Sequence, residues 1–365
     1  MFNRATATVR PGTADSGEDR TVLERESGHD VRRLETVRSV DADAWNDVVE
    51  RSACGTVFHR YEWIAAVERG LSYPGAHLVV EKDTNLIGIC PQFEVPFPRT
   101  PVTRLTSIYP GFGGPLFTTD VSEGMEVLFD AVPKVTTART AVHELRVCNT
   151  NALRYHEFLR ERGYRPVQNG GRFRLQLDRG FDDLLDQMSS SRRRRIRRAG
   201  DADTQVVEEE VTVRSLRRIF TAYERHMSRV GGEVFPRAFF EALSDMAARI
   251  VLVTARVEDE YAGGFVELLD DEQDSVHGFF ACVPEEYYAN NVSELLYEYV
   301  IRWAADNGYR YYDFGGSGAD FRDGAFSFKE SFGGELIPNL YWERGTSPLW
   351  PILRAGRAAY WRYGD

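Results

Sequence analysis

The chain has 365 residues, a formal net charge of −11 at pH 7 and 42% hydrophobic residues. This length allows two or three domains that each bury a core, and the composition is typical of a soluble globular protein. The acidic charge argues against a general nucleic-acid binder, so we expect no DNA partner. The first thirty residues lack the apolar run of a signal peptide and no window is apolar enough for a membrane span, which predicts a cytoplasmic protein.

The cysteines and histidines give no sign of a metal or nucleophile site. The four cysteines lie far apart without a C-x-x-C pair, a pattern typical of buried, reduced thiols. His59, His226 and His277 are isolated, with no cysteine or carboxylate at ligand spacing, so we expect no metal site. The sequence also has no G-x-S-x-G nucleophile elbow.

The first half of the chain alternates helical and strand patterns after a polar segment. Residues 1–30 are charged and have few large apolar side chains, which predicts a disordered tail. Apolar spacing predicts helices at 41–53, 61–70, 121–135 and 151–164. Strand patterns lie at 76–83, 86–95, 102–110 and 141–147. We expect these elements to form a first domain over 31–168.

The second half has a similar order of elements. The predicted helices lie at 181–200, 213–229 and 237–248, and the predicted strands at 171–178, 249–270 with a tight acidic turn, 274–283 and 309–314. We expect a second domain over 169–344 and a helical tail over 345–365. That tail mixes Trp, Tyr, Leu and Arg, so it either docks on the protein's own surface or contacts the inner face of a membrane as a peripheral anchor.

A long helix is predicted from residue 292 onward. Its apolar residues recur at helical spacing over 292–304 and form one stripe. Asn291, with Glu294 three residues later, has the pattern of a capping box, and Gly308 ends the helix. The helix follows an antiparallel meander and precedes another strand. This order resembles the GNAT acyltransferase fold, and its repetition predicts an α+β protein of two tandem GNAT-like domains.

The resemblance to GNAT proteins directs attention to the loop before the long helix. In that fold a pantetheine-type donor lies where two strands splay, and its pyrophosphate binds at the helix amino end. The family's donor loop reads R/Q-x-x-G-x-G/A, whereas residues 287–292 read YYANNV and hold no glycine. The standard CoA loop motif is therefore absent, which favours a different donor or a much altered loop.

Four stretches in the same order resemble the Fem-type (FemAB-like) peptidyltransferases and their relatives. They are GTVFHRYEWIAAV (55–67), SRRRRIRRAGDADTQV (191–206), ELLYEYVIRWAADNGYRYYDFGG (294–316) and FSFKESFGGELI (326–337). The last two are the specific ones. Together the four span most of the expected ordered chain.

The resemblance implies an enzyme that transfers an acyl or aminoacyl group to an amine. Fem enzymes move an amino acid from aminoacyl-tRNA onto a peptide side chain of a cell-wall precursor. We therefore expect the donor to be an aminoacyl-tRNA or an acyl-CoA, and the acceptor to be a small molecule or a cell-envelope precursor. Some members insert a two-helix arm, for which residues 205–250 leave no room, and this counts against tRNA. With no nucleophile motif, direct attack in a ternary complex is expected.

Lys329 and Asp313 are the predicted catalytic residues. Lysine occurs at only three positions among 45 basic residues, and one of them lies in the F-K-x-x-F-G stretch. The family's lysine at this point is implicated in substrate binding and in stabilising charge on the carbonyl oxygen, for which a compact ammonium is suited. Asp313 ends a strand before a glycine-rich turn and could orient or deprotonate the amine. The alternatives are a solvated helix lysine and an aspartate that caps a turn.

Further residues complete the predicted substrate site. Six of the seven residues from Arg192 to Arg198 are arginines, whose guanidinium groups match phosphate oxygens. The predicted substrate-binding residues are Arg194, Arg197 and Arg198 on one helix face, Phe328 and Phe332 beside Lys329, Tyr288 and Asn291 in the donor loop, and Trp63 in the first domain.

The arginine run also supports a second function of a different class. The chain could be a non-catalytic binding protein on the same fold that holds an anionic polymer or a lipid headgroup through Arg192–Arg198. A pocket that joins Lys329, Asp313 and the arginines would favour the enzyme. An arginine helix that points away from a closed cleft would favour the binding protein.

Overall fold

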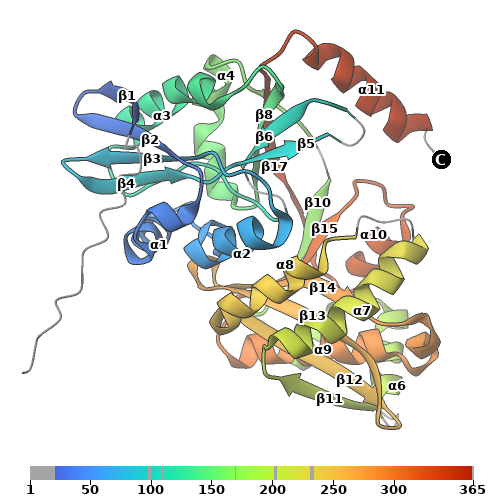
Figure 1. The fold of residues 1–365 in the computed structure, drawn as a ribbon. Coiled ribbons are helices and arrows are strands. Elements are labelled where there is room, and N and C mark those ends of the chain that lie inside the picture. The colour runs from blue at the N-terminus through green and yellow to red at the C-terminus, as the bar shows by residue number, and fades with distance from the viewer. Residues whose placement is uncertain are drawn as a thin grey trace, which may run out of the picture.

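The computed structural model describes residues 21–97, 100–107, 110–168, 170–200, 204–230 and 234–363. Two units of sheets and helices lie one above the other in Figure 1, with the first half of the chain in blue to green and the second in yellow to orange. The expected α+β class with tandem sheet-and-helix units is confirmed.

The first half contains two sheets, in the strand orders β1-β2-β3-β4-β7 and β5-β6-β8-β17-β9. Their strands are β1 Val22–Glu26, β2 His29–Leu34, β3 His77–Lys82, β4 Asn85–Cys90, β5 Phe93–Pro96, β6 Thr103–Thr106, β7 Leu116–Phe117, β8 Thr140–Val147, β9 Arg165–Pro166 and β17 Leu340–Gly345. The helices are α1 Ala42–Arg51, α2 Tyr61–Leu71, α3 Val121–Val135 and α4 His156–Glu161.

The second half is built on one sheet with the order β11-β12-β13-β14-β15-β10-β16. Its strands are β10 Gly171–Gln176, β11 Thr204–Glu209, β12 Ile250–Val257, β13 Glu260–Asp270, β14 Ser275–Cys282, β15 Tyr311–Ser317 and β16 Glu335–Pro338. The helices are α5 Phe181–Gln187, α6 Ser190–Gly200, α7 Val213–Val230, α8 Arg237–Ala242, α9 Val292–Asp306 and α10 Gly324–Glu330, and α11 Trp350–Tyr363 follows β17.

The expected disordered tail is too long. Residues 1–20 lie outside the described part, but β1 and β2 form an antiparallel hairpin that extends the first sheet beyond β3. The turn between them places Ser27 and Gly28 at positive φ, and Val31 is fully buried. Alternation of apolar and polar residues in β2 is the strand pattern that outweighs the polar composition here.

Two predicted elements are each split in the structure. The strand expected over 86–95 ends at Cys90 and restarts at Phe93, because Pro91 has no N–H for the ladder and the two pieces join different sheets. The helix expected over 181–200 breaks at Met188, whose extended backbone separates α5 from α6. The tandem order of elements is unaffected by either break.

The long helix α9 has the expected buried stripe but not the expected cap. Val292, Leu296 and Val300 are buried against the sheet. Asn291 precedes the helix in a left-handed conformation, with φ of 55°, and its side chain makes no capping hydrogen bond. Glu294 instead binds Arg192 of α6, so the predicted capping box is wrong.

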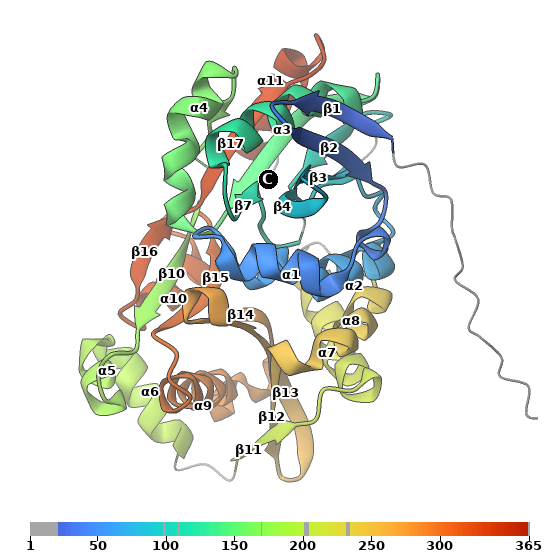
Figure 2. The same cartoon turned by 90° about the vertical axis from the view of Figure 1, so that its left-hand side faces the viewer.

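The two halves share a core, and one strand from the second half of the chain joins a sheet of the first half. One hydrophobic cluster includes side chains of α2 from the first half and of α7 and α8 from the second, and α2 lies beside α8 in both cartoon views (Figures 1 and 2). β17, which we expected within the second domain, pairs with β8 and β9 of the first half. The chain therefore crosses the seam between its halves twice.

The helical tail is present as α11, and its first turn docks on the first half. Trp350 is buried against Ala141 and Val142, with Leu353 packed beside them, whereas Ile352 is exposed. A membrane contact of this helix stays a prediction. Within the described residues, no helix combines the length and apolar character that crossing a bilayer requires.

Candidate active site

Strands β14 and β15 separate at the middle of the second sheet. They pair in parallel only over Ser275–His277 and Tyr311–Asp313. Beyond that point β15 continues to pair with β10, and β14 continues to pair with β13 across a register shift at Glu267. The shift gives β14 one extra residue, a bulge of the kind often found next to active sites. A gap therefore opens between the strands after His277 and Asp313.

A cavity of about 370 Å³ lies at this gap, and we call it the splay cavity. Its apolar wall is aromatic, and its polar side chains gather where the strands part. The lining residues are Phe58, Pro110, Gly111, Phe112, Arg146, Arg172, His277, Gly278, Phe279, Ala281, Tyr297, Asp313, Phe314, Gly315, Gly316 and Lys329. Such a mixture of apolar walls and a few convergent polar groups is typical of small-molecule sites.

Lys329 is fixed at the edge of the splay cavity. The side chain of Asp323 accepts a hydrogen bond from Phe326 N–H and starts α10, which carries the lysine. Lys329 Nζ donates to Gly315 O at 3.2 Å and to Gly316 O at 2.6 Å. Burial lowers the pKa of Lys329 to about 8, although Asp313 and Asp323 oppose the shift. Two of its three N–H bonds are thus used for positioning, and the third is left for a ligand.

Gly315 keeps the gap open. Its φ is +75°, and a Cβ at this position would lie 2.9 Å from Gly278 O across the gap and 4.0 Å from Lys329 Nζ. A side chain would therefore occupy the space between the two strands and touch the ammonium. The glycine-rich turn lets β15 come this close to β14 and to Lys329. The turn has no G-K-[ST] pattern of a nucleotide loop.

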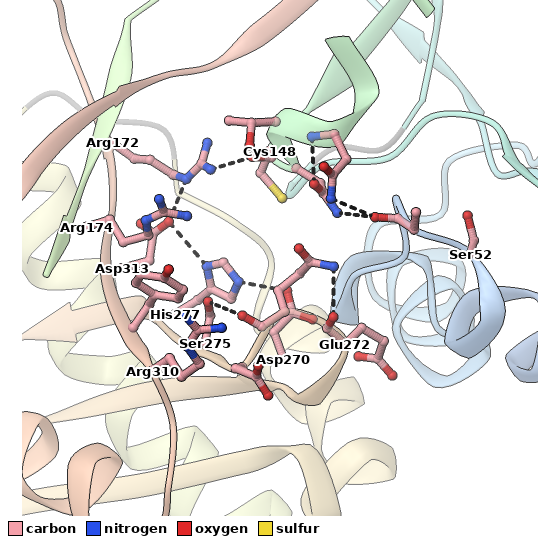
Figure 3. Close-up of a pocket in the computed structure, with 17 residues that line it drawn as sticks. Ser52, Cys148, Arg172, Arg174, Asp270, Glu272, Ser275, His277, Arg310 and Asp313 are labelled. Carbon is pink, nitrogen blue, oxygen red and sulfur yellow. Dashed lines mark hydrogen bonds and ion pairs between the residues drawn. The ribbon is translucent and has the colours of Figure 1, made fainter. Parts of the chain in front are cut away.

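A row of buried ionisable side chains lies at the point where the strands part. Arg172 Nε is 2.6 Å from Asp313 Oδ2, and the same oxygen is 3.7 Å from His277 Nδ1. His277 Nε2 lies 3.0 Å from Asp270 Oδ2, and Asp270 Oδ1 accepts a hydrogen bond from Val57 N–H of the first half. Burial raises the pKa of Asp270, and hydrogen bonding to His277 opposes that shift. We call Arg172, Asp313, His277 and Asp270 the charge row (Figure 3).

A second cavity, of about 450 Å³, lies on the other side of the charge row, and we call it the seam cavity. It is bounded by both halves of the chain (Figure 3) and is more polar than the splay cavity. Its lining residues are Ser52, Ala53, Cys148, Asn149, Thr150, Asn151, Arg172, Arg174, Asp270, Glu272, Gln273, Asp274, Ser275, His277, Arg310, Tyr311 and Asp313. Arg172, His277 and Asp313 line both cavities, so the two adjoin at the charge row.

The structure brings the two predicted catalytic residues into one cavity. Lys329 and Asp313 both line the splay cavity. Asp313 Oδ1 accepts a hydrogen bond from Gly315 N–H at 2.9 Å, so it caps the glycine turn as well as joining the charge row. With both oxygens engaged, Asp313 is suited to orienting its neighbours.

The predicted substrate-binding residues are more dispersed. Phe332 is fully buried, and Phe328 packs on it beside Tyr297 of the cavity wall. Trp63 is buried behind two cavity residues, Phe58 and Phe279. Neither Tyr288 nor Asn291 lines either cavity, and the Tyr288 hydroxyl accepts a hydrogen bond from Arg229.

The arginine run does not face the cavities. Arg194, Arg197 and Arg198 are exposed on α6, and none of them lines the splay or the seam cavity. Arg192 is the buried member: it pairs with Glu294, and its guanidinium carbon lies 4.1 Å from the centroid of the Phe328 ring. This arginine braces α10, which carries Lys329, against α9.

Three residues of the charge row were missed by sequence reasoning. His277 was judged isolated, since its carboxylate partners are 7 and 36 residues away along the chain. Arg172 and Asp270 gave no signal beyond their positions at the ends of predicted strands. One sequence signal could have pointed to the row: a histidine in a predicted strand directly follows a turn rich in acidic residues, DDEQD.

Comparison with known proteins supports the fold directly. Residues 186–330 match the family model described as an acetyltransferase (GNAT) domain. These residues form a GNAT domain. The GNAT domain contains the splay cavity's strands, α9 and Lys329, so the predicted GNAT relationship is confirmed. No curated protein matched the sequence.

Solved structures show a likeness of fold over most of the chain. The crystal structure of FemX covers 86% of this chain and 98% of its own, with a TM-score of 0.65 and 14% identity. The C-terminal domain of a putative lysylphosphatidylglycerol synthetase from Agrobacterium fabrum covers 89% of this chain and 97% of its own, with a TM-score of 0.56 and 10% identity. A tandem GNAT protein from the clavulanic acid biosynthesis pathway covers 88% of this chain and 99% of its own, with a TM-score of 0.54 and 13% identity. At these identities the likeness concerns the tandem fold, which matches the Fem-like arrangement predicted.

Proposed function

We propose that this GNAT protein is an acyltransferase that moves an acyl or aminoacyl group to an amine by direct attack in a ternary complex. The observation that carries the proposal is the Lys329 ammonium, held against Gly315 O and Gly316 O at the gap between β14 and β15. A fixed positive charge in a partly closed cavity stabilises the oxyanion that develops when an amine attacks a carbonyl.

The reaction divides between the two sides of the charge row. The donor carbonyl lies in the splay cavity with its oxygen toward Lys329, and the amine approaches from the charge row. The amine nitrogen bonds to the carbonyl carbon, and the bond from that carbon to the donor's sulfur or oxygen breaks. His277, which lines both cavities, takes the proton that the amine loses and returns it to the departing sulfur or oxygen. Asp313 and Asp270 orient the imidazole.

The donor remains an acyl-CoA or an aminoacyl-tRNA in this proposal. Two features favour a donor other than acetyl-CoA in its usual mode. The loop between β14 and α9 is a short 3-10 helix, Glu285–Asn290, in place of a glycine loop. The first turn of α9 already contains the buried Glu294 carboxylate, paired with Arg192, where GNAT proteins hold the donor's pyrophosphate. An internal carboxylate at that position opposes a second anion.

The acceptor that we propose is an amine of a small molecule or a cell-envelope precursor. Among the structural neighbours, the lysylphosphatidylglycerol synthetase domain is named for a lipid product, and the tandem GNAT protein is named for a small-molecule pathway. Both kinds of acceptor can be offered to this chain in one experiment. Contact with a membrane through α11 would apply only to the lipid-linked kind.

Mass spectrometry of acylated amines tests the function. The protein is incubated with acetyl-CoA or with charged aminoacyl-tRNA, together with a small-molecule extract or an envelope-precursor extract as the amine source. We expect Lys329→Ala to lose at least 100-fold in product formation, since removing one oxyanion donor costs about 10²–10³ in rate. Lys329→Arg should be similarly impaired because a planar guanidinium does not fit the two-carbonyl cradle. Full turnover by Lys329→Arg would contradict the assigned role.

The binding-protein alternative has one observation in its favour. Arg194, Arg197 and Arg198 are exposed and line neither cavity. A binding protein was also expected to have a closed cleft, whereas the cleft here is an open cavity lined by Lys329 and Asp313. Anion binding by wild type that is lost in Arg194→Gln, without product in any donor arm, would favour the alternative.

A further inference from the structure

The seam cavity contains charged groups that the proposed chemistry does not use. Most of its charged side chains have an internal partner: Arg172 pairs with Asp313, Glu272 pairs with Arg60, and the Asp270 carboxylate contacts the His277 imidazole. Two arginines that line it, Arg174 and Arg310, form no ion pair or side-chain hydrogen bond with any described residue. Asp274 is the one lining carboxylate of which the same is true. Among the lining side chains that have no such partner in the described residues, two are therefore arginines and one is a carboxylate.

Arg174 and Arg310 share one aromatic ring. The guanidinium carbon of Arg174 lies 4.2 Å from the centroid of the Tyr311 ring, and that of Arg310 lies 5.5 Å from it. Arg174 belongs to β10 and Arg310 immediately precedes β15, so neighbouring strands hold both stems. A guanidinium over a ring keeps its N–H edge available for an oxyanion, and the stacking restricts its motion. Both arginines therefore line the polar seam cavity with guanidinium groups that lie close to one ring.

The geometry points to an oxyanion site: we propose that Arg174 and Arg310 bind a carboxylate or phosphate group of the amine acceptor. That the bound molecule is the acceptor rests on the proposed function, whereas the existence of the anion site does not. The acceptor would lie in the seam cavity with its anionic group on the arginines and its amine at the charge row. The carboxylate of Asp274 also lines this cavity, and it disfavours an acceptor that carries more than one anionic group.

The position of the site explains why it would serve the acceptor and not the donor. The donor occupies the splay cavity, which Arg174 and Arg310 do not line. Among the described residues, Arg172, His277 and Asp313 line both the seam cavity and the splay cavity, and in this proposal the amine arrives beside them. A volume of about 450 Å³ is within the range of ordinary small-molecule sites. The acceptor is accordingly an amine that carries a carboxylate or a phosphate within the same small moiety.

Titration calorimetry at constant ionic strength tests the anion site without any assay of transfer. Inorganic phosphate and acetate are titrated separately into wild type, Arg174→Gln, Arg310→Gln and the double variant. A charge-assisted hydrogen bond contributes about 1.5–3 kcal/mol, so each single variant should bind the preferred probe at least about tenfold more weakly. Which probe binds more tightly distinguishes a phosphate from a carboxylate. Arg194→Gln on α6 removes the same charge elsewhere and should bind as wild type does.

The outcomes separate this inference from the proposed function. No binding of either probe to folded wild type, or unchanged binding in the double variant, would overturn the site. Loss of binding in Arg194→Gln instead would move the site to α6. Lys329→Ala should retain phosphate or acetate binding while losing turnover, because Lys329 does not line the seam cavity. If the probes bind through Arg174 and Arg310 but no product forms with any donor, the anion site stands and the transferase proposal falls.

Discussion

Lys329 has a charge state that depends on pH within the working range of most enzymes. Burial lowers its pKa to about 8, and its two carbonyl partners can accept hydrogen bonds from the ammonium or the amine. Deprotonation of the acceptor amine has the opposite effect on the rate, since the amine attacks only when neutral. The two effects can be separated because arginine does not titrate in this range.

We expect kcat/KM of the wild type to fall as the pH rises through about 8, as the Lys329 ammonium is lost. In Lys329→Arg the remaining activity should keep rising with pH, because the guanidinium stays charged while more of the acceptor becomes neutral. Rate profiles from pH 6 to 10 with both proteins measure the difference. Identical profiles would show that Lys329 does not act as a cation.

Glu267 gives a second prediction at the scale of one residue. It is 1% exposed, its Oε1 accepts a hydrogen bond from the Tyr312 hydroxyl at 3.2 Å, and burial raises its pKa to about 8. Between its unfolded pKa near 4.5 and 8, the folded state binds a proton that the unfolded state does not. The contribution of this group to stability is therefore full below about pH 4.5 and is lost as the pH rises through 8.

Replacing Glu267 by glutamine should flatten that pH dependence. Urea unfolding of the wild type is expected to give a free energy of unfolding that decreases between pH 5 and 8, by several kcal/mol at most, relative to Glu267→Gln. Glu260→Gln, at the exposed start of the same strand, is the matched control and should keep the wild-type slope. Parallel curves for wild type and Glu267→Gln would mean that the carboxyl is ionised throughout.

Among the elements, the gap between β14 and β15 depends on Gly315. A Cβ there would lie 2.9 Å from Gly278 O, and its φ of +75° is unfavourable for any other residue. Gly315→Ala should therefore lower turnover on the order of 100-fold, since a displacement of about 1 Å in a site has that effect. Gly316→Ala is the neighbouring control, because a Cβ at Gly316 meets nothing within 4 Å. Equal losses in the two variants would mean that the turn, and not the gap, limits the reaction.

Elements with strong local patterns could be predicted from the sequence, and those decided by long-range pairing could not. The apolar stripe over 292–304 gave α9, and the spacing over 121–135 gave α3 with its observed bounds. The β1–β2 hairpin was missed because its stability comes from pairing with β3, which a polar composition does not reveal. The capping box failed because Glu294 found a better partner in Arg192, a residue about a hundred positions away.

The candidate site follows the same division. Lys329 and Asp313 could be singled out because a rare residue and a strand end are local features. The charge row could not, because it depends on the register of β10, β14 and β15, which places Arg172, His277 and Asp313 on one face of the sheet. A shift by one residue in any of these strands would turn its member of the row to the opposite face.

At the scale of the whole molecule, both cavities are bounded by the two halves, so their shape depends on a rigid seam. Arg60 and Glu272 form a buried ion pair across it, and Gln273 Nε2 donates to Gly55 O at 2.8 Å. On the far side of the same seam, α2 packs closely on α8. Gly70 lies at this contact, where an added Cβ would be 2.3 Å from Phe239 Cα.

Gly70→Ala should therefore wedge the two halves apart. The obstacle is backbone and Phe239 is fully buried, so neither partner can move aside without opening the shared core. Overpacking of this kind costs about 1–3 kcal/mol in the free energy of unfolding, of which the gain of alanine over glycine inside a helix offsets up to about 1 kcal/mol. Urea unfolding measures the loss, and turnover should fall with it because the seam and splay cavities would widen together. Gly180→Ala, where a Cβ meets nothing within 4 Å, is the control and should be close to wild type in both measurements. A Gly70→Ala protein with wild-type stability would show that the halves are free to adjust, and the cavities could then not be held in shape by the contact between α2 and α8.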